Sequence, residues 1–206
     1  MDLQRTEAWH QQRLGRVTAS RVADVVAKTK SGYSTSRANY MAELICERLT
    51  GAKGESYMSA AMQWGVDQEP RARAAYEAET GALVTEVGFT PHGDMGATGA
   101  SPDGLVDDDG LVEIKCPITA THLETLLTET VPSRYITQMQ WQMACTGRKW
   151  CDFVSYDPRL PEGMELFVKR VPRDDKLISE LEDEVGLFIL EMSGKLEKLM
   201  EKYYGL

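Results

Sequence analysis

The chain has 206 residues, of which 42% are hydrophobic and 27% are charged, and its formal net charge at pH 7 is −9. The hydrophobic fraction excludes a wholly disordered chain, and the length suits one domain. The sequence has no apolar run long enough for a transmembrane helix, and its acidic balance argues against a basic protein that coats nucleic acid.

The charged residues and the cysteines constrain the partners and the compartment. Residues 1–54 carry nine Lys or Arg against five Asp or Glu, a net charge of +4, whereas the remainder has a net charge of −13. The N-terminal segment could therefore face an anion. The four cysteines, at positions 46, 116, 145 and 151, are too dispersed for a disulfide framework, and the first residues lack the pattern of a signal peptide. We therefore expect reduced thiols and a cytoplasmic protein with no membrane segment.

The first 80 residues are predicted to be mainly helical. Helices are expected at residues 21–28 after a cap at Ser20, from Ser34 or Thr35 to Gly51, and at residues 59–79, which Gly81 ends. Pro70 divides the last region into two helices or one kinked helix, because proline cannot donate the hydrogen bond of a helix interior. Residues 28–34 are expected to form a mobile basic loop.

From Leu83 onward the pattern becomes typical of strands and separate helices. Strands are expected at residues 83–90, 97–106, 111–115, 150–156 and 165–171, and helices at residues 119–128, 133–146 and 173–204. Residues 107–110 favour a hairpin turn. This order predicts an α/β (α+β) fold with a central mixed sheet flanked by helices. We expect a single domain, residues 1–206, with a helical part (1–80), a sheet-containing core (81–172) and a C-terminal helix (173–206).

Residue spacing in the helices indicates which faces are buried. Met139 and Met143 are four residues apart and are expected to face the core, which leaves Gln138 and Gln142 on another face. Trp9 and Trp64 are expected to be packing residues. A further apolar stripe, which could be core or an interface, consists of Leu181, Val185, Phe188 and Met192.

The clearest chemical signal comes from Asp103, Glu113 and Lys115. Side chains alternate along a strand, so Glu113 and Lys115 project from one face while Ile114 points into the core on the other. The turn at residues 107–110 returns Asp103 to a position beside Glu113 or Ile114. Two carboxylates and an ammonium group therefore converge at one point of the sheet.

Such a cluster is unfavourable unless a cation relieves the repulsion between the carboxylates. Oxygen ligands from Asp103, Glu113 and the Ile114 carbonyl suit Mg²⁺ or Mn²⁺ better than zinc. A bound ion could hold a scissile phosphate and activate a water molecule, while Lys115 orients that water or neutralises charge. The alternative is a surface hairpin with one ion pair and an acidic turn.

The spacing D-x₉-E-x-K on a hairpin resembles the PD-(D/E)xK nuclease superfamily, and further motifs accompany it. In chain order these are Ala8-Trp9-His10, Arg13-Leu14-Gly15, Thr18-Ala19-Ser20, Trp64-Gly65 with Glu69, Ser101-Pro102-Asp103-Gly104-Leu105, Glu113-Ile114-Lys115-Cys116-Pro117, Tyr135 with Gln138 and Gln140, and Tyr156-Asp157-Pro158-Arg159. Over residues 8–159 the chain resembles the phage-lambda-type alkaline exonucleases, also called YqaJ-type viral recombinases. The resemblance implies a restriction-endonuclease-like core.

The resemblance also implies roles for individual residues. The catalytic set would be Asp103, Glu113, Lys115, Glu69 and Gln138, with metal held by Asp103, Glu113, Glu69 and the Ile114 carbonyl. Arg13, Ser20 and Ser101 would hold a 5′-terminal phosphate, because a guanidinium and hydroxyl groups suit a phosphate dianion. Lys30 would reach into the DNA fork, and Met62 would separate the strands, although a core position is equally compatible with Met62.

The implied activity removes mononucleotides in the 5′→3′ direction from linear double-stranded DNA with a 5′-phosphate and leaves a 3′ single-stranded tail. The implied cofactor is Mg²⁺ or Mn²⁺, with two ions per active site. The implied partners are two further copies in a trimeric ring and a single-strand annealing protein, in the cytoplasm of a bacterium that carries the phage or prophage.

Two alternatives stay open at this point. One is a related nuclease that cuts internally or prefers single strands, against which the implied 5′-phosphate residues argue. The other is a DNA-end-binding module that has lost catalysis, against which the intact Asp103, Glu113 and Lys115 argue.

Overall fold

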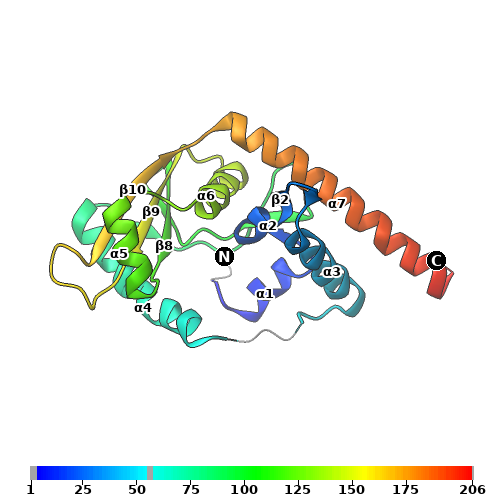
Figure 1. Ribbon diagram of the computed structural model, residues 1–206, viewed down its shortest axis with the longest axis horizontal. Coiled ribbons are helices and arrows are strands. Elements are labelled where there is room, and N and C mark those ends of the chain that lie inside the picture. The colour runs from blue at the N-terminus through cyan, green and yellow to red at the C-terminus, as the bar shows by residue number, and fades with distance from the viewer. Residues whose placement is uncertain (1–3, 55–57, 206) are drawn as a thin grey trace.

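The protein consists of a five-stranded mixed sheet and two groups of helices (Figure 1). The computed structural model describes residues 4–54 and 58–205. The helices are α1 (Glu7–Arg13), η1 (Ala19–Arg21), α2 (Val22–Val26), α3 (Thr35–Thr50), α4 (Ala60–Thr80), α5 (Thr119–Thr128), α6 (Ser133–Thr146) and α7 (Asp175–Tyr204). The strands are β1 (Val17–Thr18), β2 (Lys28–Thr29), β3 (Gly32–Tyr33), β4 (Val84–Thr85), β5 (Thr90–Pro91), β6 (Thr98–Ala100), β7 (Gly104–Val106), β8 (Gly110–Lys115), β9 (Trp150–Tyr156) and β10 (Leu166–Pro172).

The large sheet has the strand order β10-β9-β8-β7-β4. Strands β8 and β9 are parallel, and the other neighbouring pairs are antiparallel. A smaller sheet of order β1-β6-β5 joins the N-terminal segment to the strand that precedes β7. The predicted fold class, a mixed sheet flanked by helices, is confirmed.

Helices α4 and α6 cover opposite faces of the large sheet. Ile114 of β8 belongs to the same core cluster as Ala72 and Tyr76 of α4. Leu111, an odd-numbered residue of β8, belongs instead to a cluster with Met139 of α6. Because side chains alternate along a strand, the odd-numbered positions of β8 all turn toward α6.

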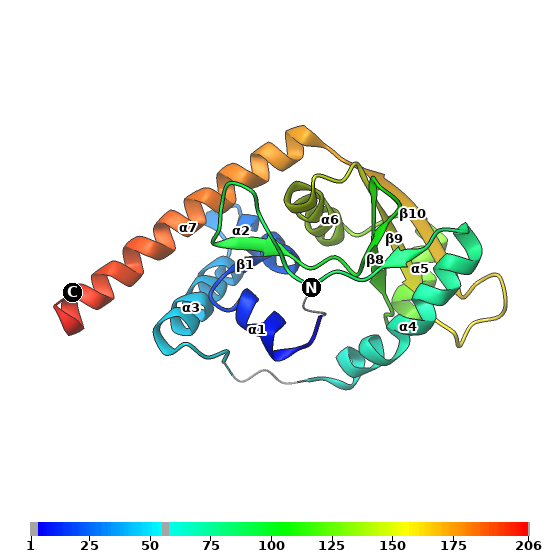
Figure 2. The same ribbon diagram turned by 180° about the vertical axis from the view of Figure 1, so that it is seen from behind.

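A third core cluster lies where α7 crosses the N-terminal helices. Figure 2 shows α7 running past α2 and α3 and extending beyond them at its C-terminal end. The stripe predicted in this helix is buried against residues of α2, α3 and α6, and it consists of Leu181, Val185, Phe188 and Met192. Its core interpretation is therefore confirmed. In the part of the chain that the structure describes, no helix is both long and apolar enough to cross a membrane.

Helices α3 and α4 end where the sequence predicts, whereas Pro70 does not divide α4. Gly51 and Gly81 adopt the left-handed conformation just after α3 and α4, which glycine does without steric cost. Helix α4 is one helix that contains Pro70, so the two-helix alternative is wrong. Burial of Tyr76 against the sheet helps to offset the cost of a proline in a helix interior, roughly 3 kcal/mol from the lost hydrogen bond and the ring clash together.

Four predicted segments differ in detail. Residues 28–34 contain the β2–β3 hairpin instead of a loop, and residues 21–28 contain only the short helix α2. Residues 83–90 contribute one two-residue strand and the start of another. The strand predicted at 97–106 is divided into β6 and β7 at Pro102, which cannot donate to a strand ladder. This division places Asp103 just before β7.

Candidate active site

The β7–β8 hairpin brings Asp103 and Glu113 together. Gly104 of β7 pairs with Val112 of β8, so Asp103 lies opposite the next position of the strand. The Oδ2 atom of Asp103 accepts a hydrogen bond of 2.7 Å from the backbone N–H of Ile114. The predicted position of Asp103, beside Glu113 or Ile114, is therefore confirmed.

The Glu113 carboxylate is held from three directions. Its Oε1 atom accepts a 2.6 Å hydrogen bond from Gln138 Nε2, and its Oε2 atom accepts a 2.5 Å hydrogen bond from Gln142 Nε2. Lys115 forms an ion pair with Oε1. Only 1% of Glu113 is exposed, so these contacts replace the hydration that the carboxylate loses. The orientation of this carboxylate is fixed by its neighbours.

Helix α6 supplies both amides because Gln138 and Gln142 are one helical turn apart. They face β8, while Met139 and Met143 are buried on the adjacent part of the helix, as predicted. Sequence reasoning identified Gln138 but gave Gln142 no role in the site. The four-residue spacing from Gln138 was the available signal.

Burial and mutual repulsion shape the charge of the cluster. Burial, followed by the neighbouring Glu113 charge, raises the pKa of Asp103 well above its ordinary value, and Lys115 only partly counters this. For Lys115 burial favours the neutral amine, but the charges of Glu113 and Asp103 outweigh it and raise the pKa of the ammonium group. The two close carboxylates therefore favour either a proton on Asp103 or a bound cation.

The donor set fits a hard divalent cation. Among the described residues, no group of three or more His, Cys, Asp or Glu side chains could hold a metal ion. Two carboxylates, Asp103 and Glu113, and the Ile114 carbonyl form a partial set, which suits Mg²⁺ because this ion keeps several water ligands. A cation would also remove the repulsion that raises the pKa of Asp103.

Glu69, the predicted ligand of a second ion, lies nearby but is paired with arginines. Its carboxylate forms ion pairs with Arg5 and with Arg73, the latter at 3.3 Å. Glu69 and Asp103 line one cavity of about 140 Å³, and after burial and Glu113 the Glu69 charge adds to the raised pKa of Asp103. Glu69 therefore faces the site, but a second ion bound there would compete with its arginine partners.

A pocket of about 200 Å³ lies beside this cluster. We call it the Arg13 pocket, and its walls include Trp9, Arg13, Ser20, Ser101 and Gln138. The Ser101 hydroxyl oxygen accepts hydrogen bonds from Trp9 Nε1 at 2.9 Å and from Arg13 Nη1 at 3.1 Å. The structure thus brings the residues predicted for a phosphate into one pocket, and Gln138 joins that pocket to Glu113.

The Arg13 guanidinium is the main charge of this pocket. It stacks over the Trp9 ring at 4.3 Å, and within the described residues it forms no ion pair. Burial lowers the pKa of Arg13, although Tyr40 and Glu47 partly counter that effect. A half-buried cation without a paired carboxylate is suited to an anionic ligand. Trp9 was predicted only to pack, but it forms the wall under Arg13, and its four-residue spacing from Arg13 was the missed signal.

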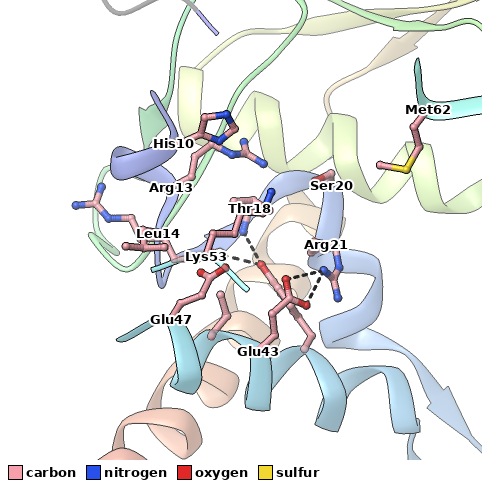
Figure 3. A pocket seen from close by; sticks show the side chains of 13 residues that line it. His10, Arg13, Leu14, Thr18, Ser20, Arg21, Glu43, Glu47, Lys53 and Met62 are labelled. Carbon is pink, nitrogen blue, oxygen red and sulfur yellow. Dashed lines mark hydrogen bonds and ion pairs between the residues drawn. The ribbon is translucent and has the colours of Figure 1, made fainter. Parts of the chain in front are cut away.

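Lys30 and Met62 occupy different places relative to the site. Lys30 is exposed in the turn of the β2–β3 hairpin and does not line the Arg13 pocket. Met62, at 54% exposure, lies on α4 and lines a further pocket with Arg13 and Ser20 (Figure 3). A core position for Met62 is therefore wrong.

The hairpin of the mixed sheet thus presents a carboxylate pair and a lysine between two layers of helices. Residues 8–149 match the family model described as a YqaJ-like viral recombinase domain, and the chain belongs to this family. The fold is restriction-endonuclease-like, and the family supports a nuclease function.

Solved structures agree with this family. The crystal structure of an alkaline exonuclease (LHK-Exo) from Laribacter hongkongensis is 57% identical, with a TM-score of 0.91 over 96% of this chain and 97% of that one. LHK-Exo in complex with dAMP matches with the same values. A phage related exonuclease from Haemophilus somnus 129PT is 14% identical, with a TM-score of 0.74 over 89% of this chain and 96% of that one, which shows a shared fold. None of the curated proteins compared matches the chain.

Proposed function

We propose that the protein is a Mg²⁺-dependent exonuclease that degrades the 5′ strand of linear double-stranded DNA to mononucleotides and leaves 3′ single-stranded tails. One observation carries the proposal. Gln138 lines the Arg13 pocket and also donates to Glu113, so an anion-binding pocket adjoins a hydrolytic carboxylate cluster. A terminal phosphate held at Arg13 and Ser101 would leave the next phosphodiester at the carboxylates, which gives one nucleotide per cut.

The relative LHK-Exo supports this product. It has been crystallised in complex with dAMP, a nucleoside monophosphate. Release of nucleoside monophosphates by this chain would follow from the same arrangement. A 57% identity over nearly the whole of both chains makes that transfer reasonable.

The proposed roles of the catalytic residues follow from their contacts. When bound, Mg²⁺ would polarise the scissile phosphate and lower the pKa of an attacking water. Asp103, Glu113 and the Ile114 carbonyl would hold it. Lys115 balances the charge of Glu113 and would donate to the charge that develops on the phosphate. Glu69, a neighbour of Asp103, would lie near a second ion or its waters.

The Arg13 pocket would determine which phosphodiester is cut, because it holds the 5′-terminal phosphate. Arg13 and Ser101 are already joined by a hydrogen bond, which orients both groups before an anion arrives. Ser20 and Gln138 supply further donors from other walls of the pocket. Such convergent donors suit a phosphate dianion better than a phosphodiester, so a 5′-phosphate end would be preferred over a 5′-hydroxyl end.

We extend the proposal to the partners and the setting. The whole chain would act as one nuclease domain in a homotrimeric ring around DNA, with Lys30 and Met62 at the fork. The N-terminal segment is positive, whereas the chain as a whole has a net charge of −9. This asymmetry supports binding of DNA on one side of the protein only. The tail would pass to a single-strand annealing protein in phage-type recombination in the bacterial cytoplasm.

A comparison of DNA topologies tests the proposal against its alternatives. Linear duplex, covalently closed circular duplex and linear single strands are incubated with Mg²⁺ or with EDTA. The proposal predicts rapid Mg²⁺-dependent loss of the linear duplex alone. Fragmentation of the circle would indicate an endonuclease, faster loss of single strands a single-strand nuclease, and end binding without loss an inactive module.

A further inference from the structure

Three cavities form a row that begins at the catalytic carboxylates. The cavity of Asp103 and Glu69 shares Gln4 and Arg5 with the Arg13 pocket. The Arg13 pocket shares Arg13 and Ser20 with a third cavity of about 320 Å³, which we call the outer pocket (Figure 3). Seen from the carboxylates, the outer pocket therefore lies beyond Arg13.

The outer pocket is positively charged. Among the residues that the structure describes, its lining includes four cations, Arg13, Arg16, Arg21 and Lys53, and two carboxylates, Glu43 and Glu47. These cations all come from the positive segment of residues 1–54, whereas the chain as a whole has a net charge of −9. Figure 3 shows Arg13, Arg21, Glu43, Glu47 and Lys53 around this space, with Met62 at its edge. The charge points to an anionic ligand.

Both carboxylates of the outer pocket are already engaged. Glu43 pairs with Arg21 at 3.1 Å, and Arg21 also pairs with Asp24 at 2.6 Å. Glu47 accepts a 2.8 Å hydrogen bond from the backbone N–H of Gly15. Glu43 is therefore paired with Arg21, whereas the charge of Glu47 partly offsets that of Arg13.

Two of these cations have no carboxylate partner. Arg16 lies over the Phe89 ring at 5.7 Å, and among residues 4–54 and 58–205 neither Arg16 nor Lys53 forms an ion pair. Arg16 also lies close to Arg48, whose pKa is lowered by burial and then by the Arg16 charge. Arg16 and Lys53 are therefore available to bind an anion in the outer pocket.

We propose that the outer pocket is a second phosphate subsite, in which Arg16 and Lys53 bind a phosphate group attached to the 5′ side of the phosphate in the Arg13 pocket. This inference rests on the proposed function. Two kinds of DNA end present that chemistry. One is a 5′-triphosphate, whose outer phosphates extend beyond the first. The other is a one-nucleotide 5′ overhang, whose terminal phosphate takes the same place while its first phosphodiester lies in the Arg13 pocket.

The subsite determines the first product. Water attacks the phosphorus at the carboxylates, the bond from that phosphorus to the 3′ oxygen of the preceding nucleotide breaks, and this oxygen gains a proton. With a triphosphate end bound across both pockets, the released molecule is a nucleoside 5′-triphosphate. With a one-nucleotide overhang bound the same way, it is a 5′-phosphorylated dinucleotide. In both cases the remaining strand carries a new 5′-monophosphate.

The test compares duplexes that differ only in the 5′ end: monophosphate, triphosphate or a one-nucleotide overhang. The first product is identified by mass spectrometry, and initial rates are measured for wild type, Arg16→Gln, Lys53→Gln and the control Lys198→Gln on exposed α7. We expect nucleoside triphosphate from the triphosphate end. We expect each pocket variant to lower the triphosphate-to-monophosphate rate ratio by about fivefold, the size of one exposed charge contact. The control should leave that ratio unchanged.

The outcomes separate the inference from the proposed function. If the pocket variants lower only the triphosphate-to-monophosphate rate ratio, the subsite binds polyphosphate. If wild type releases a dinucleotide from the overhang and the variants do not, the subsite binds the phosphate of the overhang. The inference is overturned if both variants leave every ratio unchanged while monophosphate ends are degraded normally. If wild type does not degrade monophosphate ends, it is the proposed function that fails.

Discussion

Replacement of Gln142 with Met removes one of the two amides that hold Glu113 while keeping the volume of the side chain. In the structure Gln142 Nε2 donates to Glu113 Oε2 at 2.5 Å, and both residues are buried. A hydrogen bond to a charged group contributes about 1.5–3 kcal/mol, and 1.4 kcal/mol corresponds to a tenfold change in an equilibrium constant. We therefore expect the Mg²⁺ concentration for half-maximal cleavage to rise by about 10- to 100-fold, as for other groups that orient metal ligands.

Gln140→Met is the matched control on the same helix. Gln140 is also buried, but its amide donates to the Pro172 carbonyl at 2.8 Å and accepts from the Asp174 N–H at 2.9 Å, away from Glu113. The Oε1 atom of Gln142, by contrast, has no hydrogen-bond partner within the described structure. Gln140→Met should therefore cost more thermal stability, whereas only Gln142→Met should change the Mg²⁺ requirement.

The assay is a Mg²⁺ titration of initial cleavage rates, with the melting temperature of each variant measured in parallel. At saturating Mg²⁺ the rate of Gln142→Met should return to within a few-fold of wild type, because Gln142 acts through Glu113 and does not touch the Arg13 pocket. The reasoning is refuted if Gln142→Met keeps the wild-type Mg²⁺ requirement, or if Gln140→Met shifts it equally.

Three further predictions concern the same site. Asp103→Asn should abolish cleavage but keep binding of DNA ends, because it removes a charge that a metal needs and keeps the hydrogen bond from the Ile114 N–H. Metal-dependent cleavage by this variant in a gel assay would contradict the two-carboxylate site. Arg13→Ala should slow degradation of 5′-phosphate ends at least about tenfold more than that of 5′-hydroxyl ends, since an Arg–phosphate contact is charge-assisted. Equal slowing in matched rate measurements would exclude Arg13 from phosphate binding. The raised pKa of Asp103 means that the metal-free folded protein holds a proton there which the unfolded chain has already lost, so its stability falls as pH rises through that pKa. Because Mg²⁺ must displace this proton, the Mg²⁺-induced rise in melting temperature should be larger at about pH 8.5 than at about pH 6. The opposite trend in thermal melts would contradict the assignment of Asp103 as a metal ligand.

The catalytic hairpin was predictable from sequence because local rules determine it. Alternation along a strand is enough to separate Ile114 from Glu113 and Lys115, and a four-residue turn is enough to return Asp103 to them. The helix ends at Gly51 and Gly81 follow equally from local backbone chemistry.

Other features depend on packing between distant segments, which local patterns do not contain. Gln142 meets Glu113 only because α6 packs over that face of β8, and Trp9 forms a pocket wall only because α1 lies against the segment that carries Ser101. Pro70 was expected either to divide its region into two helices or to kink one helix. Helix α4 is a single helix, and Ala72 and Tyr76, which follow Pro70, pack against the sheet. Each of these outcomes is set by tertiary contacts rather than by propensity.

The most direct test of the central claim uses a linear duplex with 5′-phosphates that is labelled on either the 5′ or the 3′ terminus of one strand. The protein is added with Mg²⁺, and the products are resolved over time, with EDTA as the metal-free control. The account predicts Mg²⁺-dependent release of the 5′ label as mononucleotide while the 3′-terminal label stays on long strands. Early release of the 3′ label, or internal fragments from both substrates, would contradict it.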